Sequence, residues 1–288
     1  MTAGRGAAEG AAHRDRVDMS AHDDAVDRVH AMSEGTVRFE IRGHTAWVTL
    51  DRPEARNAVT GRVSGAVEAA VDHVEASDDL WVGVLTGTGP VFSAGADLKE
   101  VAAGRGDTIS SPKGGFAGFV AYPRTRVWIA AVNGLALGGG LELTLACDMA
   151  VAVDTAAFGL PEVARGIMAG AGGVFRLPRA LPRAIALELV ATGGRLSAQR
   201  AVELGLINRV VPADQLTVAA RELADAVCSN APIAVRESVA VARDAYLLSD
   251  DEGWDRSHQA VKRVMATTDA IEGPLAFVEK RAPQWTGR

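Results

Sequence analysis

Short β-rich runs alternate with segments of helical periodicity through the middle of this 288-residue chain. The links between them are short, which favours an α/β core with parallel strands. Residues 60–77 carry apolar side chains at helical spacing, and Gly43-His44 separates two β-rich runs as the turn of a hairpin would. The predicted strands are residues 37–43, 45–53, 81–87, 126–134 and 149–154.

The last third of the chain becomes mainly helical. After a glycine cluster at 170–173, one further β-rich run is predicted at 206–211. The final helix is predicted over 269–281, with a break at Gly273-Pro274, because proline interrupts the hydrogen bonds of a helix. A second break, near Asn230-Ala231-Pro232, leads us to predict a core over residues 35–230 and a helical region over residues 231–288.

Residues 1–34 are predicted to form a disordered or loosely helical extension. The first 31 residues have no apolar stretch of the kind found in a secretory signal. Six acidic residues outnumber four arginines there, which is unlike a transit peptide. The predicted location is therefore cytoplasmic, and Met32 would serve well as the start of the folded part.

Composition excludes several classes of protein. The formal net charge of -6 and the pI near 5.6 argue against a nucleic-acid partner, since no basic stripe is available to neutralise phosphates. No apolar run approaches the roughly 18 residues that a membrane span needs. Cys147 and Cys228 lie in apolar patterns and are predicted to be free thiols. The six histidines show no ligand spacing, so no metal site is predicted.

The stretch NGLALGGGLELTLACD, residues 133–148, combines three consecutive glycines with one acid in an apolar helix-like run. A phosphate-binding P-loop would need Lys and Ser or Thr after Gly139, but Gly140 and Leu141 stand there. The dinucleotide fingerprint GxGxxG is also missing from this stretch and from the glycine cluster at 170–173. Both nucleotide interpretations therefore fail.

A strand that runs through glycines into a helix leaves free N–H groups at the start of the helix. Residues 93–100, SAGADLKE, form a second junction of this kind. Two such junctions could each direct one N–H at a single oxygen and so form an oxyanion hole. Tight packing turns are the alternative for either junction alone.

Two acids favour the catalytic interpretation. Glu142 falls in the first turn of the apolar helix, and Glu162 follows in a proline-containing turn. A single glutamate at a helix start is usually a favourable partner of the helix dipole. Two acids delivered to one apolar pocket are better explained as an acid/base pair whose protonation is set by the surroundings.

Five motifs, in this order and spacing, resemble the enoyl-CoA hydratase/isomerase (crotonase) family. The resemblance extends roughly from Thr36 to Arg288, and it implies a spiral of repeated ββα units followed by a C-terminal helical region that packs trimers, often paired into hexamers. The motifs are FSAGADLKE (92–100), AAVNGLALGGGLELTLACD (130–148), FGLPEVARGI (158–167), GAGGVFRLPRAL (170–181) and GRLSAQRAVELGLINRVVP (194–212).

The resemblance implies roles for particular residues. The backbone N–H groups of Ala96 and Gly139 would form the oxyanion hole, Glu142 and Glu162 would be the two catalytic acids, and Gly170 would help to hold the water. No cofactor is implied, because coenzyme A is part of the substrate. The residues implied to contact the acyl-CoA are Arg56, Ala58, Ala96, Asp97, Leu98 and Lys99, with Phe277 and Lys280 from a neighbouring subunit.

Three functions of this family remain open from the sequence. Hydration of a 2-enoyl-CoA uses both acids, whereas a double-bond isomerase needs only one. The ending at 269–288 resembles the carnitinyl-CoA dehydratase branch, which hydrates an acyl group with a quaternary ammonium, and Ala169 replaces a proline usual in the family. A non-catalytic scaffold is a fourth, remote alternative, which the intact acid pair argues against.

Overall fold

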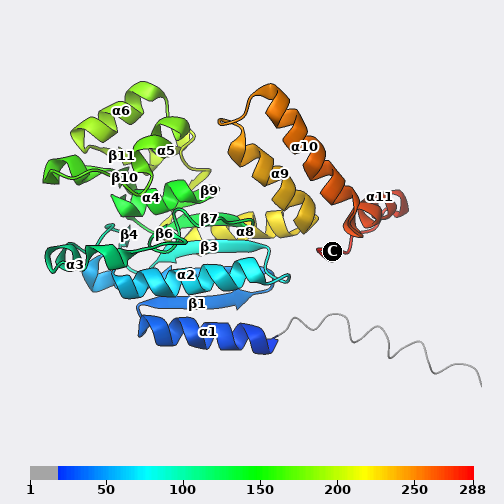
Figure 1. The fold of residues 1–288 in the computed structure, drawn as a ribbon, viewed down its shortest axis with the longest axis horizontal. Helices are drawn as coiled ribbons and strands as arrows, with labels where there is room; N and C mark the ends of the chain where they lie inside the picture. Colours follow the sequence, from blue (N-terminus) through cyan, green and yellow to red (C-terminus); the bar gives the residue numbers. More distant parts are fainter. Residues whose placement is uncertain (1–18) are drawn as a thin grey trace, which may run out of the picture.

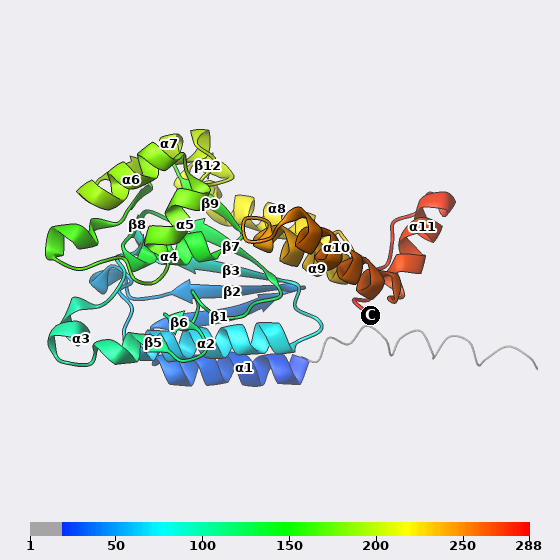
Figure 2. The ribbon, with the colours of Figure 1, turned by 45° about the horizontal axis from the view of Figure 1, so that its top comes forward.

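A six-stranded sheet forms the centre of the structure (Figures 1 and 2). The computed structural model describes residues 19–288. The first two strands form the predicted antiparallel hairpin, and each later neighbour is parallel, as the alternating pattern predicts. The strands, in spatial order, are β1 (Val37–Arg42), β2 (Thr45–Leu50), β3 (Val82–Gly87), β7 (Val127–Val132), β9 (Met149–Val153) and β12 (Arg209–Val211).

A smaller, four-stranded sheet accounts for the repeated ββα units. Each of β3, β7 and β9 is followed by a short strand of this sheet and then by a helix, so the same unit occurs three times. The predicted spiral of ββα units is thereby confirmed. The short strands are β11 (Arg195–Ser197), β10 (Ala157–Gly159), β8 (Leu135–Leu137) and β4 (Val91–Ser93) in spatial order, and β5 (Ser110–Ser111) pairs separately with β6 (Gly115–Phe116).

Helices cover the large sheet on both faces. The predicted helix at 60–77 is α2 (Gly61–Ala76), which Thr60 caps through its side chain and whose Val67, Val71 and Val74 are fully buried. Helix α8 (Leu216–Cys228) packs against β3, β7 and β9. The remaining helices of the core are α3 (Leu98–Ala102), α4 (Gly139–Ala146), α5 (Gly173–Ala180), α6 (Arg183–Thr192) and α7 (Ala198–Glu203).

The N-terminal extension contains an element that the sequence interpretation missed. Residues 19–33 form helix α1 (Met19–Ser33), which lies along α2 and β1 (Figure 1). Ala25 and Val29 are buried four residues apart, on one face of α1. The prediction of a disordered or loosely helical extension is therefore corrected for residues 19–33, because this apolar face has a partner in the core. Residues 1–18 lie outside the described part of the chain.

The contact between α1 and α2 also contains two histidines. His22 Nδ1 lies 2.8 Å from His73 Nε2, and His22 is almost completely buried. The pKa of His73 lies below its ordinary value, first because of burial and then because of the nearby His22 and Arg28. The packing of α1 on the core is thus coupled to the neutral form of His73.

Three helices extend from the core beyond the predicted boundary at 230/231. They are α9 (Pro232–Asp244), α10 (Asp250–Met265) and α11 (Asp269–Glu279), and they project to one side of the molecule (Figures 1 and 2). Arg243 on α9 is fixed to the core by two 2.7 Å hydrogen bonds to Asp148, and it also donates to the carbonyl oxygens of Arg124 and Arg126.

The predicted break at Gly273-Pro274 is wrong, since α11 continues through Pro274. The C-terminal residues fold back onto this helix and support it. Asp269 accepts hydrogen bonds from the backbone N–H groups of Thr286 and Gly287, at 2.8 and 2.9 Å. Trp285 also donates its Nε1–H to the carbonyl oxygen of Ser229. These tertiary contacts outweigh the one backbone hydrogen bond that proline removes.

Two further findings concern membrane-spanning helices and the two cysteines. None of the helices between residues 19 and 288 combines the length and the apolar character that crossing a bilayer requires. Cys147 and Cys228 are both free thiols, as predicted.

Candidate active site

A cavity of about 780 Å³ is lined by residues at the starts of α3, α4 and α5. These three helices lie at the end of the molecule opposite α11 (Figures 1 and 2). The walls of the cavity come from segments far apart in the sequence: the loop after β4, residues 109–121, the start of α4, and residues 161–176. The structure brings together on this cavity all five residues for which catalytic roles were implied, namely Ala96, Gly139, Glu142, Glu162 and Gly170.

The two glycine-containing junctions meet directly. A Cβ atom added to Gly95 would lie only 2.7 Å from the backbone nitrogen of Gly139, so the turn before α3 touches the start of α4. Gly140 is equally constrained, because its added Cβ would lie 2.1 Å from the carbonyl oxygen of Ser93. Larger residues at these positions would separate the two junctions.

Two backbone N–H groups at this meeting point have no protein partner. Gly139 is the first residue of α4, and the residue before it, Gly138, provides no side-chain cap. At the other junction, the carbonyl oxygen of Gly95 accepts a hydrogen bond from the N–H of Val59, and the N–H of Asp97 donates one to the carbonyl oxygen of Val59. In the part of the chain that the structure describes, the N–H groups of Ala96 and Gly139 enter no hydrogen bond. They are available to a ligand oxygen.

Glu142 is buried in the first turn of α4, with 3% of its surface exposed. Its Oε1 accepts a 2.8 Å hydrogen bond from the N–H of Gly173, the first residue of α5. Burial raises the pKa of Glu142, and the neighbouring Glu162 carboxylate raises it further. The backbone N–H groups of Gly173 and Ala171, together with Arg176, act in the opposite direction. The carboxylate is therefore fixed in place with a raised proton affinity.

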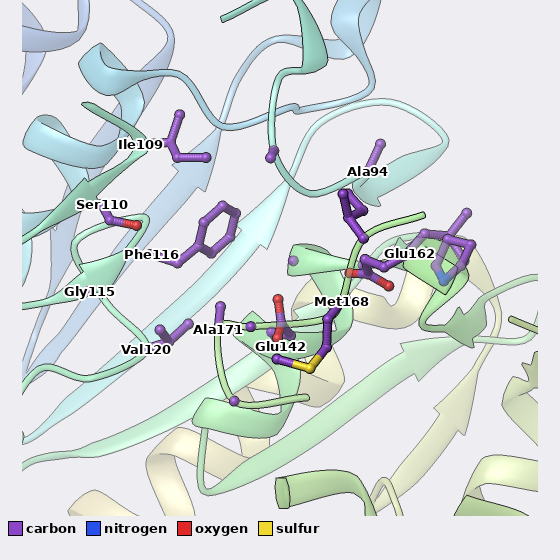
Figure 3. A pocket seen from close by; sticks show the side chains of 18 of the residues that line it. Ala94, Ile109, Ser110, Gly115, Phe116, Val120, Glu142, Glu162, Met168 and Ala171 are labelled. Atoms are coloured by element: carbon purple, nitrogen blue, oxygen red, sulfur yellow. The ribbon is translucent and has the colours of Figure 1, made fainter. Parts of the chain in front are cut away.

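Glu162 reaches the cavity from the 3-10 helix at Pro161–Arg165 (Figure 3). Its Oε1 lies beside Gly138, where an added Cβ would approach it to 2.9 Å. Its Oε2 is buried and has no hydrogen-bond partner among residues 19–288. Burial raises the pKa of Glu162 above its ordinary value, although Arg165 opposes the shift. This side chain thus reaches the cavity with one oxygen free for a ligand.

Sequence reasoning missed some of the residues that line the site. The N–H that holds Glu142 belongs to Gly173, whereas Gly170 lines the cavity three residues earlier. The glycine cluster at 170–173 was the available signal, since it opens helix α5. The wall formed by Ile109, Phe116 and Val120 lies on the other side of the cavity from Glu162 (Figure 3). Ordinary apolar residues such as these carry no sequence signal.

The residues implied to contact the acyl-CoA fall into three groups. Arg56, Ala96 and Leu98 line the cavity, whereas the adjoining Ala58, Asp97 and Lys99 do not. Asp97 instead caps α3 through the N–H of Lys99 and pairs with Arg52 at 3.2 Å. The third group, Phe277 and Lys280, belongs to the α11 end of the chain, away from the cavity of the same molecule (Figures 1 and 2).

Comparison with known proteins gives the family. The family model described as enoyl-CoA hydratase/isomerase matches residues 40–288. This chain belongs to that family. The resemblance inferred from the motifs is thereby confirmed. Helix α1 lies before the residues that the family model matches.

Named relatives within the enoyl-CoA hydratase/isomerase family differ in the activity they carry. The chain is 43% identical over 259 residues to a carnitinyl-CoA dehydratase of Proteus mirabilis, covering 88% of this chain and 99% of the relative. An enoyl-CoA hydratase structure from Mycobacterium tuberculosis H37Rv is 41% identical, with a TM-score of 0.85. A carnitinyl-CoA hydratase structure from Mycobacterium avium is 45% identical, with a TM-score of 0.68. Both structures cover 88% of this chain, which covers 99% of each.

Proposed function

We propose that this protein is a 2-enoyl-CoA hydratase, a lyase that adds water reversibly across the 2,3 double bond of an acyl-CoA thioester. One observation carries the proposal: two carboxylates with raised pKa values share a cavity with two backbone N–H groups that have no protein partner. The reaction needs no cofactor, because coenzyme A belongs to the substrate and acid/base groups suffice for the addition of water.

The N–H groups of Ala96 and Gly139 would stabilise the charge that develops during the reaction. Attack of water on the β-carbon of a conjugated thioester moves negative charge to the thioester oxygen. Two fixed donors at that oxygen favour the enolate-like transition state, and one such donor is worth about 100-fold to 1,000-fold in rate. The tight glycine turns serve this role, since they let the substrate approach the backbone.

The two acids would hold different numbers of protons. Glu142, whose ionised carboxylate is stabilised by the hydrogen bond from Gly173, starts ionised and takes a proton from the attacking water. Glu162 starts protonated and gives its proton to the α-carbon from the oxygen that has no protein partner. Two carboxyl groups in one apolar cavity titrate as a coupled pair, so a single shared proton is the expected state.

Carnitinyl-CoA dehydratase is a second candidate, favoured by the names of the 42–43% identical curated relatives. A trimethylammonium group would require a carboxylate or an aromatic cage. Of the described residues that line the cavity, Glu142 and Glu162 are the acids, and both are engaged in catalysis. Four arginines line the same cavity, at positions 56, 165, 176 and 195, and they disfavour a cationic acyl group. The charges therefore support an uncharged acyl group on the coenzyme A thioester.

The assembly we propose is a homotrimer or a hexamer of two trimers. Helices α10 and α11 expose apolar side chains that a single chain leaves in water, which is typical of an interface. In such an assembly, Phe277 and Lys280 would complete the coenzyme A site of a neighbour. The most exposed of these residues are Trp254, Val261, Met265, Ile271, Phe277 and Val278. A cytoplasmic location fits the two free thiols.

The experiment is a hydration assay with crotonyl-CoA, followed at the absorbance of the conjugated thioester. Glu142→Gln and Glu162→Gln should each lose at least about 100-fold in kcat while binding of coenzyme A persists. Glu188→Gln, which changes an exposed glutamate on α6, is the matched control and should retain wild-type activity. Full activity in either cavity variant would refute the acid/base pair. Faster turnover of the trimethylammonium substrate would favour the second candidate.

A further inference from the structure

The apolar wall of the cavity is part of a segment that is unusually constrained. Residues 109–121 provide Ile109, Phe116 and Val120, which gather on one side of the cavity (Figure 3). Phe116 lies against the start of α4, because a Cβ added to Gly139 would be 2.5 Å from its ring. An acyl chain whose thioester oxygen reaches the N–H of Gly139 therefore meets this ring within its first few carbons.

Helix α2 holds the outer side of this segment. The carboxylate of Glu68 accepts hydrogen bonds from the hydroxyl of Ser111 and, at 3.0 Å, from the N–H of Gly114. Gly118 packs directly on the helix, since its added Cβ would lie 2.5 Å from the carbonyl oxygen of Ser64 and 2.6 Å from Glu68 Cβ. The segment thus has no room to move towards α2.

Two further contacts hold the same segment beyond Gly118. Asp72, four residues after Glu68 and therefore on the same face of α2, accepts hydrogen bonds from the hydroxyl of Tyr122 and from Lys113. On the cavity side, Arg176 of α5 donates a 2.7 Å hydrogen bond to the carbonyl oxygen of Val120. The wall is therefore fixed from both sides.

We infer that Glu68 is a positioning residue that, with Asp72, holds the Phe116 wall in place and so restricts the cavity to short acyl chains. This inference rests on the proposed acyl-CoA site. Neither carboxylate lines the cavity, so both act through the segment that they hold, residues 111–122. Loss of Glu68 should free residues 111–116, so that the Phe116 ring can shift along the cavity and admit longer chains while Gly118 stays packed on α2.

The test uses saturated thioesters, which bind without being hydrated and so separate this inference from the catalytic proposal. Calorimetry gives the Kd of butanoyl-CoA and of decanoyl-CoA for each variant. In Glu68→Ala the ratio of the decanoyl Kd to the butanoyl Kd should fall by about 10-fold, the discrimination that one methylene group can bring in an apolar pocket. Glu68→Gln retains an acceptor oxygen and should restore the wild-type ratio.

Two further variants keep the result decisive. Glu34→Ala removes an exposed ion pair with Arg62 of α2, without touching residues 109–121, and should leave the ratio unchanged. Tyr122→Phe removes one hydroxyl and should lower the ratio even if Glu68→Ala fails to fold. An unchanged ratio in the folded variants, or an equal change in Glu34→Ala, would overturn the inference. A protein that binds neither thioester would overturn it together with the acyl-CoA site.

Discussion

Replacing Gly138 by alanine tests the geometry of the site most directly, because this residue precedes α4 and lies against Glu162. Its backbone, at φ 58° and ψ -125°, has a conformation that residues with a side chain rarely adopt. An added Cβ would lie 2.9 Å from Glu162 Oε1, whereas ordinary contact begins near 3.4 Å. The carboxylate must therefore move by about 0.5 Å, or the turn must open.

Both effects can be given a magnitude. The strained backbone should lower the free energy of unfolding by about 1–3 kcal/mol. A misplacement of about 1 Å in a catalytic arrangement can cost about 100-fold in rate, so about 0.5 Å corresponds to about 10-fold, or about 1.4 kcal/mol of activation free energy. The variant should therefore be less stable and also slower.

Urea unfolding and the kcat of crotonyl-CoA hydration measure these two effects separately. Gly205→Ala is the matched control, since Gly205 has φ +80° and its added Cβ would meet no atom within 4 Å. The control should lose stability through its backbone alone and keep the wild-type kcat. A Gly138→Ala protein with wild-type kcat would show that the position of Glu162 does not limit the reaction.

Three further predictions concern stability. At about pH 8 the Glu142→Gln protein should have a larger free energy of unfolding than the wild type. The pKa of Glu142 is raised on folding, so the stability that this residue contributes is lost as the pH rises through its pKa in the folded protein. That difference should vanish near pH 4, and equal stability of the two proteins at pH 8 would contradict it. The pKa of His73 is lowered, so stability should fall as pH drops below its ordinary value of 6.5, and urea titrations of His73→Gln should show a weaker dependence. The Arg243→Met variant should lose about 2–3 kcal/mol of unfolding free energy, because the Arg243–Asp148 pair is half-buried and so lies between exposed and fully buried ion pairs. Arg256→Met, which breaks the more exposed Arg256–Asp244 pair, should lose at most about 1 kcal/mol. Equal losses in the two variants would contradict a larger contribution from the half-buried Arg243–Asp148 pair.

The local features of the fold could be predicted because each depends on residues close together in the sequence. Apolar spacing over 60–77 predicted α2, and Gly43-His44 predicted the hairpin of β1 and β2. The break at Gly273-Pro274 was wrongly predicted from the same kind of evidence. Proline lowers helical stability locally, but the distant tail that packs on α11 reverses the outcome.

The convergence of the site could be predicted only in part. The motifs identified the two glycine junctions and the two acids, and the structure places them on one cavity. It did not follow from the motifs that Gly173 holds Glu142, or that helix α2 fixes the opposite wall through Glu68. Both contacts join residues more than 30 positions apart, for which sequence spacing gives no signal.

By itself, the sequence determined most of the strands and helices of the core and which of them carry the acids and the free N–H groups, because periodicity, glycines and turn chemistry are local properties. Tertiary structure alone decided which surfaces those elements share. The apolar face of α1 became part of the core because it packs against α2 and β1. Glu142 acquired its raised pKa because β-strand order and helix packing enclose it with Glu162 in one cavity. Burial and neighbouring charge are properties of the folded chain, so the proton affinity of this site arises only on folding.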